Sequence, residues 1–392
     1  MNSKLNYVLS CSGKNHYFDI AKVLYNRKQL TKIICGYPWF KLKKYGIKKE
    51  FVSSNGFIRI LREPLISSKF YKKLDNFLNS LNSKNIDRIA FNFINKNTDI
   101  DVLLGFAGVN LMSGKLMRDK EKIYICDSTS AHIQEQNNIL AEEYKEFLNK
   151  KFQINEWVIE SKTKEYENAN IILTPSEFVK KSFEKFKFSN VETLELAVDT
   201  SLFFPIEKIK KNNNSFDIIF IGNISIQKGL HYLIEAFKKF KHPNKRLHIV
   251  GSQTNDKDFF KKNLLMDDVI VYGHLKQENL NKIINQCHVC VLPSVQDGFG
   301  LVVSQAGAAG CPSIVSNNAG ASDIVKKNRS GFSVKARSAD SISEKLQLLA
   351  DDKNLLSEIS QNALKFSKKN TWENYVTKLD EIILNYKSKN II

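Results

Sequence analysis

The chain has 392 residues, more than one hydrophobic core usually organises, so its length predicts two domains. Hydrophobic residues make up 42% and charged residues 26% of the sequence, a composition that excludes disordered and collagen-like classes. The apolar runs are strand-sized, far below the roughly 20 residues that a membrane-spanning helix needs. Residues 1–10 contain no signal-peptide pattern, so we expect a cytoplasmic protein.

The six cysteines are scattered, and only Cys287 and Cys290 lie close together, as C-x-x-C. No second pair of cysteines or histidines completes a zinc ligand set. Because free cysteine is among the most buried residue types, we expect both thiols to be packing residues in a reduced protein. No D-x-D motif follows a predicted strand, so we expect neither a metal nor a cofactor.

The net charge of +18 arises mainly in the first hundred residues, where 19 lysines and arginines stand against 6 acidic residues. In residues 39–45 and 69–73, aromatic side chains alternate with lysines, a pattern that suits an anionic membrane surface. We therefore expect peripheral contact with the inner face of the cytoplasmic membrane through residues 1–100. A lysine-rich solvated surface is the alternative explanation, and we expect no nucleic-acid partner.

Short β-rich runs alternate with helical stretches over the first two hundred residues. The predicted strands are Leu5–Ser10, Arg88–Phe93, Asp101–Phe106, Lys122–Cys126 and Asn170–Leu173. The polar stretch Ile133–Glu167 predicts two helices. Residues Asp199–Ser215 predict a linker, because their lysines and asparagines show no periodicity.

A second alternating series begins at Phe216. Its predicted strands are Phe216–Ile221, Arg246–Val250, Asp268–Val271, His288–Leu292 and Pro312–Val315, and its helices begin near Lys228, Lys257, Leu275, Gly300 and Ser322. Strand–helix alternation predicts an α/β protein with two doubly wound parallel sheets and a ligand site between them. We expect an N-terminal domain over 1–205, a C-terminal domain over 206–369, and a final helix over 370–392 that packs back on the N-terminal domain.

The first candidate site is the loop after the predicted strand Phe216–Ile221. Gly222 ends the strand, Asn223 follows, and a helix opens near Lys228. A strand, a glycine loop and a helix start present backbone N–H groups and the positive end of a helix dipole to an anion. Lys228 adds a positive charge that can reach a phosphate.

A second strand–loop–helix segment follows the strand His288–Leu292. Its candidate site residues are Asp297, Gly298, Phe299, Gly300, Leu301 and Gln305. The two glycines permit close approach to the backbone, and the helix start offers unpaired N–H donors. Asp297 and Gln305 are eight residues apart, and we expect them to face one cleft. A third loop, Asn318–Asp323, also enters a helix.

These segments resemble the donor domain of the retaining GT-B glycosyltransferases of family four, the glycosyl transferases group 1. The family pattern is G-R-L-x-x-x-K-G, then P-S-x-x-E-G-F-G with a second glutamate eight residues after the first, then G-G-x-x-E. The resemblance is strong over residues 216–330 and patchy over 1–205. It implies two Rossmann-like domains that face a central cleft, with a C-terminal crossing helix.

The resemblance also implies roles for the candidate residues. Lys228 would hold the donor diphosphate, Asp297 would contact the sugar hydroxyls and Gln305 the ribose. The turn Gly298–Leu301 would face the phosphate. Three positions depart from the family pattern: Asn223 replaces an arginine, Asp297 is one methylene shorter than glutamate, and Gln305 lacks the charge of the second glutamate. A hydrogen bond to a charged group contributes about 1.5–3 kcal/mol, and a neutral one about 1 kcal/mol. The loss of charge would therefore weaken nucleotide binding without abolishing it, and we interpret these changes as tuning of donor binding.

In the first half, residues 127–132 follow a predicted strand and resemble the family loop that bears an active-site histidine. This implies that His132 positions the sugar from the N-terminal domain. The loop after the first strand carries one glycine, Gly13, where the family usually has two, and we include it in the donor site. For the other histidines, His16 among them, we expect structural roles.

The implied function is transfer of a sugar from a nucleotide-diphosphate donor to a saccharide or lipid-linked acceptor. We expect it to be metal-independent, with retention of configuration, and to belong to bacterial surface polysaccharide or glycolipid biosynthesis. Two alternatives remain open. One is a sugar-nucleotide epimerase with the same fold, and the other is a non-catalytic subunit that binds a nucleotide sugar.

Overall fold

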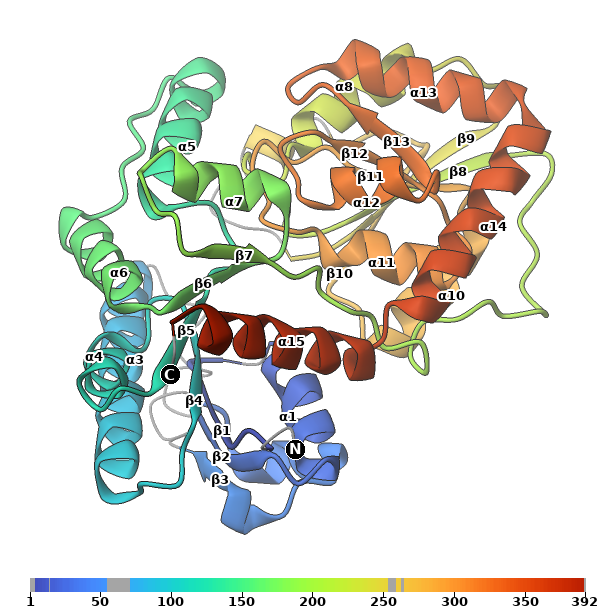
Figure 1. Ribbon diagram of the computed structural model, residues 1–392. Coiled ribbons are helices and arrows are strands. Elements are labelled where there is room, and N and C mark those ends of the chain that lie inside the picture. Colours follow the sequence, from blue (N-terminus) through green and yellow to red (C-terminus); the bar gives the residue numbers. More distant parts are fainter. Residues whose placement is uncertain (1–3, 14, 55–70, 253–258, 262–263, 391–392) are drawn as a thin grey trace.

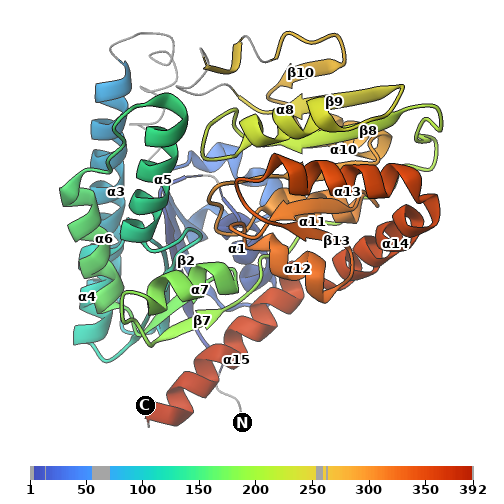
Figure 2. The same cartoon turned by 90° about the horizontal axis from the view of Figure 1, so that it is seen from above.

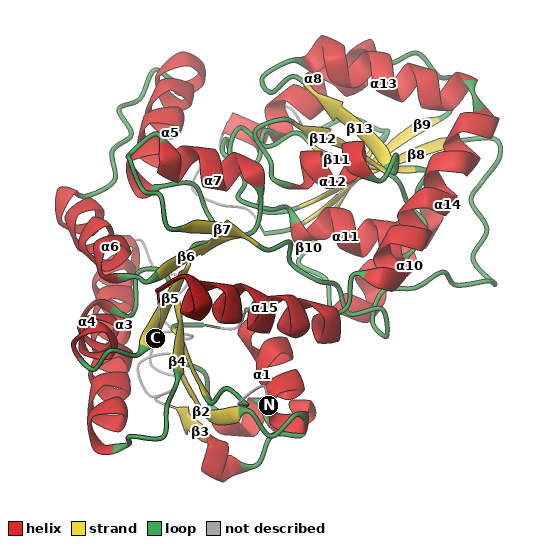
Figure 3. Cartoon of the chain, in the orientation of Figure 1, coloured by secondary structure: helices red, strands yellow, loops and turns green. Residues whose placement is uncertain are grey.

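The computed structural model describes residues 4–13, 15–54, 71–252, 259–261 and 264–390. They form two parallel β-sheets, each with helices on both faces (Figures 1 and 3). The predicted α/β class with two doubly wound domains is confirmed. The predicted helix start near Lys257 and residues 69–70 of the second aromatic–lysine segment lie outside the described residues.

The N-terminal sheet has the strand order β3-β2-β1-β4-β5-β6-β7. Its strands are β1 Tyr7–Cys11, β2 Leu30–Cys35, β3 Val52–Ser54, β4 Val102–Phe106, β5 Ile123–Asp127, β6 Ile171–Thr174 and β7 Val191–Thr193. The helices of this half are α1 Tyr17–Asn26, α3 Tyr71–Lys96, α4 Leu111–Asp119, α5 Ile133–Leu148, α6 Glu156–Asn168 and α7 Glu177–Glu184, with short 3-10 helices η1 Trp39–Lys41, η2 Lys43–Tyr45 and η3 Lys49–Phe51. The two helices predicted within Ile133–Glu167 are confirmed as α5 and α6.

The C-terminal sheet has the order β10-β9-β8-β11-β12-β13. Its strands are β8 Phe216–Ile221, β9 Lys245–Val250, β10 Val269–Gly273, β11 Val289–Leu292, β12 Ser313–Ser316 and β13 Gly331–Val334. The helices are α8 Leu230–Lys239, α10 Gln277–Gln286, α11 Leu301–Ala308, α12 Ala321–Lys327, α13 Ala339–Asp351, α14 Lys353–Lys369 and α15 Trp372–Asn390. In both sheets the order reverses beside the first strand, which places a ligand crevice at the carboxyl ends of the strands.

The central strands are buried on both faces, as expected for parallel strands covered by helices. All six residues of β8 and all five of β1 are buried. All six cysteines are buried in these cores, so the interpretation of Cys287 and Cys290 as packing residues is confirmed. Among the described residues, no helix combines the length and apolar content needed to cross a membrane.

The last helix, α15, crosses from the second domain and lies along the first (Figures 1 and 2). Its buried side chains join the core around β1 and α1; they are Trp372, Tyr375, Val376, Leu379 and Ile383. The Tyr7 hydroxyl donates a hydrogen bond to the Asp380 carboxylate. Residues from the far end of the chain therefore complete the N-terminal core on this face.

One predicted strand, Arg88–Phe93, is wrong, because these residues lie inside α3. The buried apolar residues of this region are Ile86, Ala90 and Ile94, which are spaced four residues apart and form one face of a helix. Sequence analysis also missed β2, β3, β7 and β13.

Helix α5 starts in the N-terminal domain but packs on the C-terminal one. The side chain of Glu143 on this helix is fully buried and accepts hydrogen bonds from His231 Nε2 at 2.9 Å, Tyr232 Oη at 2.9 Å and Arg337 Nε at 2.6 Å. Burial alone would raise the pKa of this carboxyl, but the hydrogen bonds from His231 and Tyr232 and the charge of Arg337 hold the pKa below its usual value. A carboxylate of one domain is thus bound inside the other.

The His132 ring points into the N-terminal domain, which contradicts its predicted role in the cleft. The residue is 3% exposed, and its ring stacks on Phe186 at a centroid distance of 4.1 Å, with Phe183, Phe188 and Tyr166 around it. Nδ1 caps α5 by accepting from the Gln134 amide, and Nε2 is buried without a hydrogen-bond partner in the described structure. His132 is a structural capping residue here.

Replacing the buried carboxylate should weaken the junction between the domains. Glu143→Ala leaves Arg337 and His231 without their partner, so we expect it to lower the free energy of unfolding by about 3–5 kcal/mol, measured by urea denaturation. Glu142→Ala is the matched control, because its side chain is 68% exposed and makes only long contacts with Arg337. Equal losses in both variants would contradict a structural role for Glu143.

Burial of His132 should make stability depend on pH. Burial disfavours the charged ring and lowers the pKa of His132 to about 4. The unfolded chain binds this proton near pH 6.5, so the stabilisation is present above pH 6.5 and is lost as pH falls towards 4, by about 3 kcal/mol in all. His132→Asn keeps a capping acceptor but cannot titrate, and we expect its free energy of unfolding to fall less over this interval. An unchanged pH dependence would contradict this assignment.

Candidate functional site

Three loops of the C-terminal domain meet at the carboxyl ends of β8, β11 and β12. The Val295 amide donates to the Gln227 carbonyl at 3.0 Å, and the Asp297 amide donates to the Asn318 carbonyl at 3.0 Å. Gly229 has a φ of 67°, and a Cβ at this position would lie 2.0 Å from the Pro293 carbonyl oxygen. The sequence therefore needs glycine at position 229 to bring the first two loops together.

An ion pair joins these loops where the anion site was predicted. Lys228 Nζ lies 2.6 Å from Asp297 Oδ2, and the two side chains are 25% and 14% exposed. The pair is therefore partly shielded but remains accessible. A cation and a carboxylate therefore lie side by side on these two loops.

Helix α11 begins beside this ion pair. Its N-cap is Gly300, with a φ of 86°, and no side chain caps its first turn. The first N–H groups of such a helix are available to an anion. The ring of Phe299 is only 3% exposed and packs in the N-terminal core, so only the backbone of this residue can belong to the predicted phosphate-facing turn.

The N-terminal domain contacts the same turn directly. Ser176 Oγ donates to the Gly298 carbonyl at 2.7 Å, and Gln296 Nε2 donates to Ser130 Oγ at 3.2 Å. A Cβ at position 298 would lie 1.9 Å from the Thr129 carbonyl oxygen, so glycine is what allows the loops of the two domains to approach. The loop after β5 thus lies against the loop that carries Asp297.

The remaining predicted residues are spread around this turn. Gly222 and Asn223 begin the β8–α8 loop, where Asn223 is exposed, and Gly13 lies in the β1–α1 loop of the other domain. Gln305 is half-buried on α11 and forms no hydrogen bond within the described residues. The structure therefore brings Lys228, Asp297 and the start of α11 together, whereas Gln305 forms no hydrogen bond with them among the described residues.

Sequence analysis missed a buried pair at the carboxyl ends of β1 and β5. His16 Nε2 lies 3.0 Å from Asp127 Oδ2, and the His16 ring stacks on Trp372 at a centroid distance of 5.9 Å. The sequence offered only their positions: Asp127 ends the buried strand β5, and His16 stands at the start of α1, in the loop that follows β1. Their separation of 111 residues hid the pairing.

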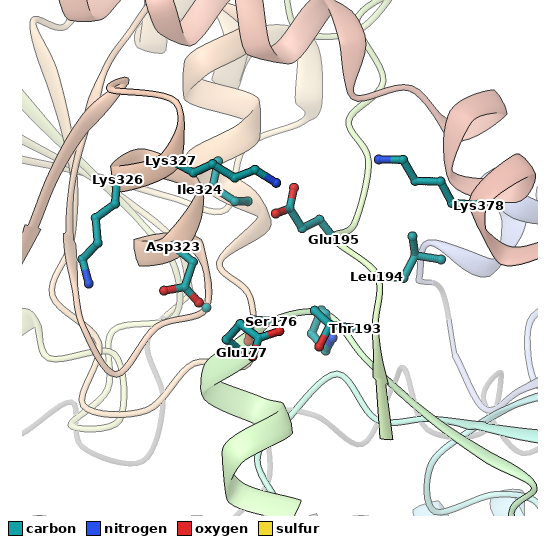
Figure 4. A pocket seen from close by; sticks show the side chains of 12 residues that line it. Ser176, Glu177, Thr193, Leu194, Glu195, Asp323, Ile324, Lys326, Lys327 and Lys378 are labelled. Carbon is teal, nitrogen blue, oxygen red and sulfur yellow. The ribbon is translucent and has the colours of Figure 1, made fainter. Parts of the chain in front are cut away.

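A cavity of about 550 Å³ lies between the domains, with α7 and the end of β7 on one side and α12 and α15 on the other (Figure 4). Three acidic residues, Glu177, Glu195 and Asp323, and three basic residues, Lys326, Lys327 and Lys378, line it. The Lys327 and Lys378 side chains point towards Glu195. Because the charges balance, this cavity favours a diphosphate less than the Lys228 loop does.

In the described part of the chain, no three His, Cys, Asp or Glu side chains are placed to hold a metal ion.

The whole fold is similar to solved two-domain enzymes. Sucrose-phosphate synthase from Thermosynechococcus elongatus aligns over 98% of this chain and 100% of its own, with a TM-score of 0.72 and 14% identity. Anabaena HepE in complex with UDP and glucose aligns over 97% of this chain and 100% of its own, with a TM-score of 0.69 and 13% identity. These likenesses support the GT-B arrangement of two Rossmann-like domains.

The sequence of the C-terminal domain matches a known family. Residues 204–366 match the model of the glycosyl transferases group 1. The capsular polysaccharide biosynthesis glycosyltransferase CapM of Staphylococcus aureus is 30% identical over 49% of this chain and 50% of its own length. The chain spans about half or less of the length of the curated relatives that it matches first. Residues 204–366 of the C-terminal domain are therefore similar in sequence to the glycosyl transferases group 1.

Proposed function

We propose that this protein transfers a sugar from a nucleotide-diphosphate donor to a saccharide or lipid-linked acceptor in bacterial surface polysaccharide or glycolipid biosynthesis. The observation that carries the proposal is the Lys228–Asp297 ion pair beside the start of α11. The family match over residues 204–366 supports it. Two similar proteins also support it: CapM is a capsular polysaccharide biosynthesis glycosyltransferase, and the HepE structure is a complex with UDP and glucose.

The reaction breaks the bond between the anomeric carbon and the diphosphate and forms a bond from that carbon to an acceptor oxygen. Negative charge develops on the departing diphosphate, and one of its oxygens takes the proton of the acceptor hydroxyl. Lys228 and the first N–H groups of α11 stabilise this charge electrostatically, without a metal ion. Asp297 holds the sugar through its hydroxyls, and the acceptor attacks from the face that the leaving group vacates, so the configuration is retained.

Substitution of Lys228 tests the diphosphate site. We expect Lys228→Ala to raise the dissociation constant for UDP or GDP about tenfold to a hundredfold, because one charged contact to phosphate is lost. Isothermal titration calorimetry measures this change. Lys238→Ala, an exposed lysine at the end of α8, is the matched control. Unchanged affinity in Lys228→Ala, or equal weakening in both variants, would show that the diphosphate binds elsewhere.

We also propose peripheral contact with the inner face of an anionic membrane through residues 1–100. The η1–η2 segment supports this, because Phe40 is 59% exposed and Lys43 Nζ lies 4.9 Å from the centre of the Trp39 ring. Aromatic rings beside lysines suit the interface between headgroups and hydrocarbon.

Flotation with liposomes tests membrane contact. We expect the protein to float with vesicles that contain phosphatidylglycerol at low salt, and to float less at moderate salt because surface charges are screened. Phe40→Ala should reduce flotation. Phe204→Ala should not, because Phe204, although 45% exposed, lies outside residues 1–100 on a segment that is hydrogen-bonded to α10. Absence of flotation at both salt concentrations would contradict the proposal.

A further inference from the structure

A cavity of about 830 Å³ lies on the N-terminal domain, between α3, the loop from β4 to α4, and the segment that leads into α6. These elements lie together along one flank of the molecule (Figure 2). Apolar side chains form much of the wall: Val109, Met112, Phe152, Ile154, Trp157 and Val158. Met112 and Trp157 are 51% and 50% exposed. The volume is in the range of small-molecule pockets, about 300–1,000 Å³.

A lysine with no partner borders this apolar space. Lys162 on α6 is half-buried, and its ammonium forms no hydrogen bond or ion pair within the described structure. Its aliphatic stem lies against Gly108, where a Cβ would be 2.8 Å from Lys162 Cε. Burial lowers the pKa of this amine, because a low-dielectric site disfavours its charge. An unpaired ammonium in such a site gains from a bound anion.

The acidic residues of the cavity are already bound to the protein. Glu165 accepts hydrogen bonds from the amides of Gly108, Val109 and Asn110 and from the Tyr124 hydroxyl. Asp87 accepts from the amides of Met112 and Ser113 and from Ser113 Oγ. Burial raises the pKa of both carboxyl groups. Their oxygens therefore hold the β4–α4 loop. The charge of Glu165 raises the pKa of Lys162 and so offsets part of the effect of burial, but no hydrogen bond or ion pair joins the two side chains in the described structure.

Two exposed basic residues complete the charge pattern. Lys84 and Arg88 lie one turn apart on α3 and also line the cavity. Arg88 donates one hydrogen bond to Asn85, and Lys84 has no partner within the described residues. The cavity thus combines an apolar wall with basic groups that are free to meet an anion.

We propose that this cavity binds a lipid phosphate, with the hydrocarbon chain along Trp157, Met112 and Phe152 and the phosphate at Lys162, Lys84 and Arg88. The basic side chains would bind the phosphate by charge complementarity, and the apolar wall would bind the hydrocarbon chain. This site is separate from the donor loops and its occupancy needs neither donor nor turnover. Its test is therefore independent of the proposed transfer, and either proposal can fail alone.

The test is calorimetric titration of the intact protein with dodecyl phosphate below its critical micelle concentration. We expect saturable binding of one molecule per chain. Lys162→Met keeps the length of the side chain but removes the charge, and should weaken binding about tenfold or more. Lys164→Met on the same helix is exposed and outside the cavity, and should leave binding unchanged. Trp157→Ala should weaken binding without unfolding the protein, because half of its surface is already exposed.

Two further ligands distinguish recognition of the phosphate headgroup from recognition of the hydrocarbon chain. Inorganic phosphate should bind far more weakly than dodecyl phosphate, and uncharged dodecyl maltoside should also bind more weakly. Equal binding of dodecyl maltoside would overturn the proposal, because it would indicate an apolar surface without headgroup recognition. Equal effects of the substitutions at Lys162 and Lys164 would overturn it too. If Lys162→Met fails to fold, Lys84→Met provides the same comparison on an exposed residue, and unchanged affinity there would count against the site.

Discussion

The arrangement of the two domains depends on one buried carboxylate. Glu143 belongs to α5, which leaves the N-terminal sheet directly after the loop at residues 128–132, yet its partners His231, Tyr232 and Arg337 belong to the C-terminal domain. A buried carboxylate is strongly unfavourable unless it is paired and hydrogen-bonded, so α5 must stay on the second domain. The loop before α5 is therefore held near the β11–α11 turn, where Ser130 bonds Gln296.

Electrostatics then define the place of the proposed reaction. Lys228 and Asp297 lie on two loops of one domain, and glycine at position 229 allows those loops to touch. Helix α11 adds the positive end of its dipole beside them. Positive charge, one carboxylate and backbone donors converge where loops from both domains meet, which is the arrangement that charge development on a departing diphosphate needs. The buried His16–Asp127 pair lies on the opposing edge of the N-terminal sheet.

The sequence predicts the C-terminal domain better than the N-terminal one. Strands such as β8 and β11 are continuous apolar runs, because both of their faces are buried, and such runs are easily recognised. Residues 88–93 also contain apolar side chains, but their burial follows the helical spacing of α3. Lys228 and Asp297 were predictable because each follows its strand in a recognisable motif. The orientation of the His132 ring and the pairing of His16 with Asp127 depend on contacts distant in sequence, which no local pattern reveals.

The most direct test of the central claim is to incubate the protein with a panel of nucleotide sugars and candidate saccharide and lipid-linked acceptors, and to follow the phosphorus signals by NMR. A glycosyltransferase releases the nucleoside diphosphate in step with formation of a new glycoside, and Lys228→Ala should slow that release. Conversion of the donor into an isomeric nucleotide sugar without acceptor would indicate an epimerase. Donor binding without release of diphosphate for any acceptor would indicate a binding subunit, and either result would contradict the assignment.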